Sequence, residues 1–319
     1  MGKRRSWAFA LLAALVVAPV GVRGQDRYPS QTVTVIIPFT AGGGVDLVAR
    51  ALAAEMSKLL GQSFVVVNRD GAAGAIGFAA LAQAKPDGYT LASSPATPIT
   101  NVPHLQKELA YTFDSFAPIC QTFENVFAVV VPPSSPYKTL AGLLEAARAN
   151  PGKLTYGSVG TGSIPHLSVA ALAKATGVHV QLVPYRGDAQ MLPNLLSGEL
   201  AFGSAAISSI SGRGLRVLAV FSDKRHPSVP DAPAVTELGV PYIQPGLNGL
   251  FAVRGTPQSV LDALERACQQ ATGTEAFRAQ VGKLDQTVAY LGAADFAKRL
   301  REDYEFKGRL VRELGLKPQ

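Results

Sequence analysis

Histidine and cysteine are scarce in this sequence. It has four histidines and two cysteines in 319 residues. The histidines (His104, His166, His179 and His226) share no metal-ligand spacing. The glycine-rich loops contain no Gly-x-Gly-x-x-Gly register and no Gly-Lys-Ser/Thr run for a nucleotide phosphate. We therefore expect no metal centre and no cofactor.

The sequence also lacks a strong excess of charge of one sign. Its formal net charge is +7, and its first 24 residues carry four basic residues and no acidic one, so the remainder carries 7 − 4 = +3. This excess is small and evenly spread, which gives no reason to expect nucleic acid or a membrane surface as a partner.

Long apolar runs are absent beyond the N-terminus. Residues 1–24 have a basic start, a short apolar core at Trp7–Val17 and small residues before Gln25. This order is typical of a secretory signal that is cleaved near Gly24, and the core is shorter than the roughly 20 residues of a spanning helix. We expect a soluble protein exported to the periplasm, with a retained membrane anchor as the alternative.

The two cysteines leave two interpretations open. Cys120 lies in an apolar, strand-like run (FAPICQTF), and Cys268 lies in a segment with helical periodicity. An oxidising compartment permits a disulfide between them. Two separate buried thiols fit these positions equally well.

Short β-branched runs alternate with helical patterns, which predicts an α/β fold in a chain long enough for two domains. The predicted strands are Val33–Ile37, Phe64–Val67, Tyr89–Ala92, Phe127–Val131, Leu154–Gly157, Val180–Pro184, Val217–Phe221 and Gly249–Val253. The predicted helices are Asp46–Leu60, Leu140–Ala149, Ser163–Ala175, Ser259–Ala271, Glu275–Val281 and Ala294–Leu314. We interpret Phe127–Pro133 as a crossing from one lobe to the other, and Gly246–Gly255 as the return.

One pattern occurs twice: a β-like run ends in a loop rich in glycine and hydroxyl groups, and the loop opens into an amphipathic helix. The copies are Thr32–Arg50 (TVTVIIPFTAGGGVDLVAR) and Leu154–Leu167 (LTYGSVGTGSIPHL). Such a loop presents free backbone N–H groups at the positive end of a helix dipole, which suits a small anion. The copies predict a carboxylate held between two lobes, although a plain strand-to-helix turn is the alternative for the first loop.

The second copy also invites a hydrolase interpretation, with Ser158 as nucleophile and His166 as base. A nucleophile elbow needs glycine two residues before the serine, where Tyr156 stands. A secreted serine hydrolase is therefore kept only as an alternative.

Ten segments together resemble the substrate-binding receptors of tripartite tricarboxylate transporters, often called Bug receptors. They are PFTAGGGVDLVAR, NRDGAAGAIG, KPDGYTL, FAPI, NPGKLTYGSVGTGSIPHL, VPYRG, LLSG, LRVLAV, PDAPAVTELG and GLFAVRGTP, in this order along the chain. The resemblance implies a type II periplasmic binding-protein fold: two α/β lobes joined by a two-strand hinge, with the ligand cleft between them. It also implies a non-enzymatic receptor that passes a small carboxylate to membrane permease subunits.

The resemblance and the loops together give the expected layout. Residues 25–127 and 246–319 form lobe 1, and residues 128–245 form lobe 2 of an expected monomer. The residues expected at the ligand are Phe39, Thr40, Ala41, Gly42, Gly43, Asp46, Ser94, Thr97, Ser158, Gly160, Thr161, Gly162, Ser163, His166, Arg186 and Ala205.

One departure from the family pattern bears on the ligand. The resemblance implies an aspartate where Ala205 stands, and in the members of the family that bind amino acids this aspartate would be the partner of the ligand ammonium. A buried ammonium without a countercharge costs several kcal/mol. We therefore expect a carboxylate without an amine. A ligand-sensing subunit for a membrane kinase is the alternative that would use the same site.

Overall fold

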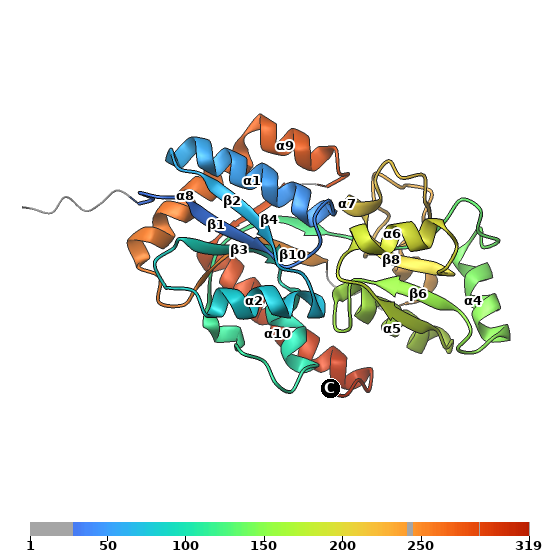
Figure 1. The fold of residues 1–319 in the computed structure, drawn as a ribbon. Helices are drawn as coiled ribbons and strands as arrows, with labels where there is room; N and C mark the ends of the chain where they lie inside the picture. Colours follow the sequence, from blue (N-terminus) through green and yellow to red (C-terminus); the bar gives the residue numbers. More distant parts are fainter. Residues whose placement is uncertain (1–27, 241–244, 287, 319) are drawn as a thin grey trace, which may run out of the picture.

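The computed structural model describes residues 28–240, 245–286 and 288–318, which form two α/β lobes lying side by side (Figure 1). The predicted signal, residues 1–24 with its cleavage point near Gly24, lies outside these ranges. Among the described helices, none combines the length and the apolar character that crossing a membrane requires.

A mixed sheet forms the centre of the first lobe. Its strands among the described residues are β1 (Val33–Ile37), β2 (Phe64–Asn68), β3 (Thr90–Pro95), β4 (Phe116–Asn125), β10 (Gly246–Val253) and β11 (Val288–Gly292). They lie in the order β11-β4-β10-β3-β1-β2. β1 runs parallel to β2 and β3, whereas β10 runs antiparallel to both β3 and β4.

The second lobe repeats this arrangement. Its strands are β5 (Phe127–Val131), β6 (Thr155–Ser158), β7 (Gln181–Pro184), β8 (Phe202–Ala206) and β9 (Arg216–Phe221), in the order β7-β6-β8-β5-β9. β6 runs parallel to β7 and β8, and β5 runs antiparallel to β8. In each lobe, therefore, the strand that leads into a glycine-rich loop lies between two parallel neighbours.

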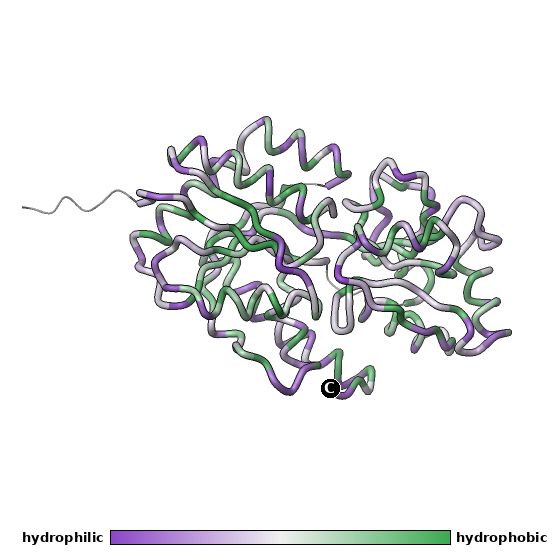
Figure 2. The backbone as a smooth tube through the Cα atoms, viewed as in Figure 1, coloured by the Kyte–Doolittle hydropathy of each residue, from purple (hydrophilic) through white to green (hydrophobic). Residues whose placement is uncertain are grey.

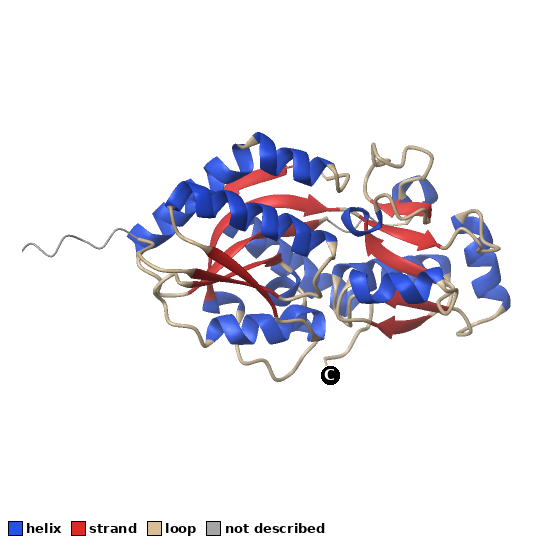
Figure 3. Ribbon diagram, turned by 45° about the horizontal axis from the view of Figure 1, so that its top comes forward, coloured by secondary structure: helices blue, strands red, loops and turns tan. Residues whose placement is uncertain are grey.

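Helices cover both faces of the two sheets (Figure 3). They are α1 (Gly44–Leu60), α2 (Ala75–Ala82), α3 (Thr97–Thr100), α4 (Leu140–Ala149), α5 (Ile164–Thr176), α6 (Asp188–Leu196), α7 (Ile207–Ile210), α8 (Gln258–Gly273), α9 (Glu275–Gly282) and α10 (Ala293–Glu313). In α1 the helical spacing of Val48, Leu52 and Met56 turns a buried stripe toward the sheet. The helix ends at Gly61, whose φ of 69° is left-handed and favours glycine.

Between β4 and β10 the chain leaves the first sheet and returns to it, in slightly different places from those predicted. The predicted crossing strands, β5 and β10, each lie inside one sheet. The first crossing comes at Val126, between the end of β4 and the start of β5, and the second comes before β10. β5 and β10 thus each begin directly after the chain has passed from one lobe to the other.

Both sheets are buried between apolar layers, and Figure 2 shows hydrophobic residues gathered along the strands. Phe78, Phe251 and Phe296 lie in the core on one face of the first sheet. α10 was predicted to belong to the first lobe alone, but Val311 near its end packs in the core of the second lobe. A helix of 21 residues is about 30 Å long, because each residue adds about 1.5 Å. This length lets α10 reach from one lobe to the other.

A disulfide between Cys120 of β4 and Cys268 of α8 settles the cysteine alternatives. The two Cα atoms lie 6.6 Å apart, within the usual range for a disulfide. The bond fastens α8 to the first sheet and closes a sequence separation of 148 residues.

Candidate ligand-binding site

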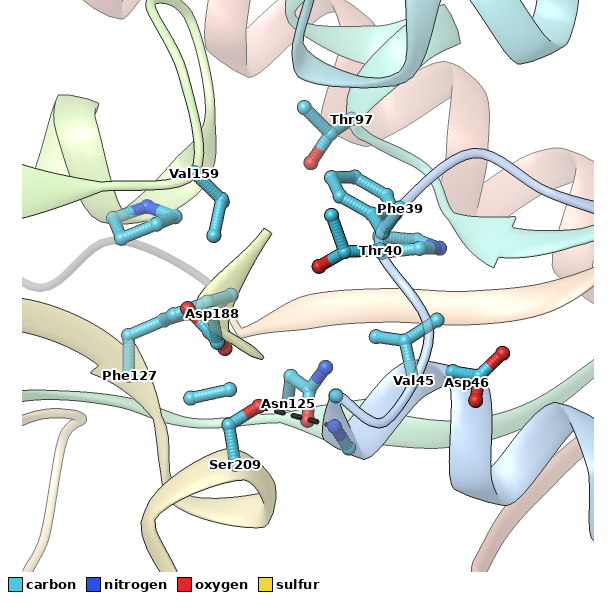
Figure 4. Close-up of a pocket in the computed structure, with 15 residues that line it drawn as sticks. Phe39, Thr40, Val45, Asp46, Thr97, Asn125, Phe127, Val159, Asp188 and Ser209 are labelled. Atoms are coloured by element: carbon cyan, nitrogen blue, oxygen red, sulfur yellow. Dashed lines mark hydrogen bonds between the residues drawn. The ribbon is translucent and has the colours of Figure 1, made fainter. Parts of the chain in front are cut away.

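A cavity lies between the two lobes, where the β1–α1 loop faces the second sheet (Figure 4). Its lining residues are Phe39, Thr40, Gly43, Gly44, Val45, Asp46, Pro95, Thr97, Asn125, Phe127, Val159, Pro165, Asp188, Ala206 and Ser209. The volume within which the centre of a water molecule can lie is about 40 Å³. One bound water needs about 10–15 Å³ of such volume. With the lobes in this position, the space suits a group of a few heavy atoms.

The first wall is the loop between β1 and α1, which Asp46 holds in place. The Asp46 carboxylate accepts hydrogen bonds from the Gly42 N–H, from Arg50 Nε and from Asn68 Nδ2, each at 2.9 Å. Asn68 Nδ2 also donates to the Phe39 carbonyl at 2.9 Å. The loop conformation is therefore fixed by side chains behind it.

Asp46 stays ionised in this position. Burial raises the pKa of its carboxyl, but the hydrogen bonds from Arg50, Gly42 and Asn68 outweigh burial and hold the pKa below its usual value. In Figure 4 its carboxylate points away from the cavity. Asp46 thus shapes the loop and presents no oxygen to a ligand.

The N-terminus of α1 opens onto the cavity. Gly43 is its N-cap and provides no side-chain cap, and the N–H of Gly44 donates to the Ser209 hydroxyl at 3.2 Å. The other first-turn N–H groups have no partner within the helix, and the helix dipole gives this end a partial positive charge. The arrangement is chemically suited to an anion.

The second wall is the loop between β6 and α5, whose polar groups mainly bond to one another. The Ser163 hydroxyl donates to the Gly160 carbonyl at 2.7 Å and lies 3.1 Å from the Ser158 hydroxyl. The Gly162 N–H donates to His166 Nδ1 at 3.0 Å. Of this segment, only Val159 and Pro165 line the cavity.

This geometry does not assemble a serine nucleophile with a base. His166 Nδ1 accepts from the backbone of its own loop, and the hydrogen-bonding neighbour of Ser158 is Ser163. Burial lowers the pKa of His166 to about 4, so the ring is neutral at physiological pH. The predicted Ser158–His166 hydrolase pair is therefore not formed in this structure.

Several expected ligand residues lie away from the cavity. Ala41, Gly42 and Thr161 are exposed, and the Ser94 hydroxyl donates to the carbonyl of Pro95 at 2.7 Å. Arg186 is exposed at the cleft edge, where its Nη1 lies 3.8 Å from Asp70 Oδ2. The cavity is instead reached by Phe39, Thr40, Gly43, Asp46 and Thr97 from the expected set.

Ala205 also lies outside the lining. It packs in the apolar core with Ala128 and Val220, while the next residue, Ala206, lines the cavity. Successive residues of a strand face opposite sides of the sheet, so an aspartate at this position would point into that core. The argument for an amine-free ligand that rested on Ala205 is not supported by this geometry.

Sequence reasoning missed lining residues that tertiary contacts bring to the cavity. Asn125 and Phe127 flank the crossing between the lobes, and Asp188 directly follows VPYRG, one of the ten segments that carry the family resemblance. In the sequence, the only signal that these three residues line the cavity is that they stand next to segments already recognised. Within the described ranges, no three His, Cys, Asp or Glu side chains are grouped so that they could hold a metal ion.

The lobes touch across the cavity, so the structure represents a closed arrangement. Besides the Gly44–Ser209 hydrogen bond, Asn101 Nδ2 donates to the Gly162 carbonyl at 3.1 Å. A Cβ atom on Gly187 would lie 2.2 Å from Thr40 Oγ1 and 3.0 Å from the Thr40 backbone nitrogen, so the two loops pack closely at this glycine.

Residues 48–316 match the family model described as "Tripartite tricarboxylate transporter family receptor". The chain belongs to this family. It is 31% identical to protein BugT of Bordetella pertussis over 88% of this chain and 90% of that protein. The family consists of solute-binding receptors and not of enzymes, as predicted.

Solved structures confirm the periplasmic binding-protein fold. The structure titled "R. palustris Rpa4515 with adipate" is 28% identical, with a TM-score of 0.86, covering 92% of this chain and 100% of that one. MatC of Rhodopseudomonas palustris with bound malate is also 28% identical, with a TM-score of 0.83, covering 89% of this chain and 100% of that one.

Proposed function

We propose that this receptor captures a small carboxylate, outside the cytoplasm, in the cavity between its lobes. The observation that carries the proposal is the N-terminus of α1, which opens onto the cavity through the glycine-rich loop. Neither lysine nor arginine is among the lining residues, so helix N–H groups and hydroxyls would hold the anion. The proposed contacts are the loop backbone at Phe39, Thr40 and Gly43, with the hydroxyls of Thr40 and Thr97.

Two related receptors support this class of ligand. The structures at 28% identity that carry adipate and malate contain dicarboxylates of four to six carbons. The buried hydroxyl of Thr40 has no hydrogen-bond partner among the described residues, and it would gain one from a carboxylate oxygen. We propose a mono- or dicarboxylate as the ligand.

We further propose that the loaded receptor delivers this carboxylate to membrane permease subunits. The family description, which names a tripartite transporter receptor, supports this partner. The Cys120–Cys268 disulfide supports an oxidising, extracytoplasmic location. A signal that is cleaved near Gly24 remains part of the proposal.

A thermal-shift series on residues 25–319 tests the ligand class. The compounds are acetate, malate and adipate, each paired with its neutral amide, which keeps the shape and removes the charge. A ligand that binds only the folded protein raises the unfolding temperature by mass action. We expect at least one acid to stabilise the protein and its amide not to do so. Equal stabilisation by acid and amide, or none by any acid, contradicts the proposal.

A further inference from the structure

The cavity contains a second acidic side chain with a role of its own. Asp188 is the first residue of α6 and is only 9% exposed. It lines the cavity from the second lobe, and its Oδ1 has no hydrogen-bond partner among the described residues. Figure 4 shows it on the opposite side of the cavity from Val45 and Asp46. A buried, unpartnered oxygen at a ligand cavity needs an explanation.

No positively charged side chain of the described residues forms a direct ion pair with Asp188. Arg213 acts on it only through its electrostatic field, together with hydrogen bonding from Ser209 and the Ala206 backbone. On α1, Asp46 is already bonded to Arg50.

The remaining titratable neighbours give no countercharge either. His166 on α5 is neutral because burial lowers its pKa to about 4, and Arg186, before α6, faces Asp70. Burial raises the pKa of Asp188 to about 6, and Ser209, Ala206 and Arg213 oppose that rise only in part.

A carboxylate in the same cavity would meet this carboxyl at close range. Two unit charges about 4 Å apart at an intermediate dielectric repel by the equivalent of roughly a thousandfold in a binding constant. Protonating a carboxyl with a pKa of about 6 at pH 7 costs only about tenfold. Taking up a proton is therefore the much cheaper way for Asp188 to accommodate an anion.

We propose that Asp188 takes up a proton when a carboxylate enters the cavity, and that the neutral acid donates this proton in a hydrogen bond to the ligand. The proposal rests on the proposed function, because it requires a carboxylate ligand. The proton comes from the solvent and stays on the Asp188 carboxyl, so no covalent bond to the ligand forms. Asp188 thus determines specificity: it favours an anion that accepts a hydrogen bond, and it couples capture to pH.

Because ligand binding is coupled to proton uptake, the apparent dissociation constant should change with pH by a measurable amount. Only the protonated receptor binds, so the apparent dissociation constant rises about tenfold for each pH unit above the pKa of Asp188. Between pH 6.5 and 8.5 the expected loss of affinity is close to a hundredfold. Over this range malate, adipate and acetate are fully ionised, and so their own titration does not contribute.

Calorimetric titration with acetate, malate and adipate, and with aspartate as the amine-bearing comparison, gives the pH profile between pH 5.5 and 8.5. At pH 8, two buffers of different ionisation enthalpy measure the proton balance. We expect wild-type protein to take up close to one proton per carboxylate bound. In Asp188→Asn the amide supplies a hydrogen-bond donor without titrating, so we expect no uptake, a flat pH profile and tighter binding at pH 8. Glu199→Gln, at an exposed carboxyl beyond the end of α6, is the matched control and should behave as wild type.

Each result separates the two proposals. If none of the three acids binds between pH 5.5 and 8.5, the proposed function fails and this inference falls with it. If an acid binds with no proton uptake and a flat pH profile, the function stands and the inference about Asp188 is wrong. Tight binding of aspartate without proton uptake, lost in Asp188→Asn, would show an ionised Asp188 paired with an ammonium and would also overturn it. If Asp188→Asn does not fold, the number of protons that the wild-type protein takes up on binding an acid decides between these outcomes.

Discussion

The backbone N–H of Gly44 in the first lobe donates to the hydroxyl of Ser209 in the second lobe, at 3.2 Å. The same glycine lies against α7 so closely that a Cβ atom on it would be 2.4 Å from Ser208 Oγ and 2.8 Å from the Ser208 carbonyl carbon. The carbonyl carbon is backbone and cannot rotate away. The closed arrangement therefore requires the absence of a side chain at the start of α1.

Gly44→Ala should block closure while leaving each lobe folded. Alanine is a better helix former than glycine, so the fold has no reason to weaken. We expect carboxylates that stabilise the wild type to bind at least tenfold more weakly, as measured by calorimetric titration. Gly273→Ala, in α8 with open space around it, is the matched control. Affinity within twofold of wild type would show that binding does not need this closed arrangement.

Removing the disulfide should destabilise the first lobe without changing the site. The bond closes a separation of 148 residues, and removing a disulfide typically costs about 2–5 kcal/mol. We expect Cys120→Ala/Cys268→Ala to unfold at lower urea concentration, with an unchanged dissociation constant for carboxylates. Dithiothreitol should shift the wild type in the same direction and leave the double variant unaffected. An unchanged urea midpoint in both experiments would count against a formed bond.

Local patterns predicted the elements that local sequence determines. Val33–Ile37, Phe127–Val131 and Leu140–Ala149 have the predicted bounds, because each has a clear apolar period and turn residues beside it. The segment Phe202–Ala206 (FGSAA) was missed, since glycine, serine and alanine have little preference for strands. It becomes β8 because it pairs with β6 and β5 in the middle of the second sheet.

The candidate site shows the same difference between features that local sequence determines and features that tertiary contacts determine. The β1–α1 loop was recognised because its glycines and the following helix are adjacent in the sequence. Asp188 was overlooked because its importance comes from its burial at the cavity, which tertiary contacts create. Ala205 and Ala206 show the limit most clearly: a shift of one residue along a strand moves a side chain from the core to the cavity.

Arg186 offers a test of the cavity boundary. It was expected at the ligand, but its exposed guanidinium lies 3.8 Å from Asp70 at the cleft edge, and exposed pairs contribute about 0–1 kcal/mol. We expect Arg186→Ala to weaken carboxylate binding by less than about fivefold in calorimetric titration. Arg148→Ala, on α4, is the control for loss of an exposed positive charge. A loss above tenfold confined to Arg186→Ala would place its side chain on the ligand.

His166 should make the receptor sensitive to acid. Its pKa in the folded protein is about 4, against about 6.5 in an unfolded chain. Between these values the unfolded chain binds a proton that the folded protein does not, so the free energy of unfolding falls as the pH falls. The expected loss from pH 7.5 to pH 4 is about 3 kcal/mol from this residue.

His166→Asn isolates this contribution. The asparagine side-chain oxygen can accept the Gly162 N–H in place of Nδ1, but it does not titrate. Urea unfolding at pH 7.5, 6, 5 and 4 should show the wild type losing about 3 kcal/mol more than the variant. His179→Asn, at an exposed histidine, should follow the wild type. Parallel pH curves for wild type and His166→Asn would mean that the ring titrates normally, and that the β6–α5 loop admits water to it.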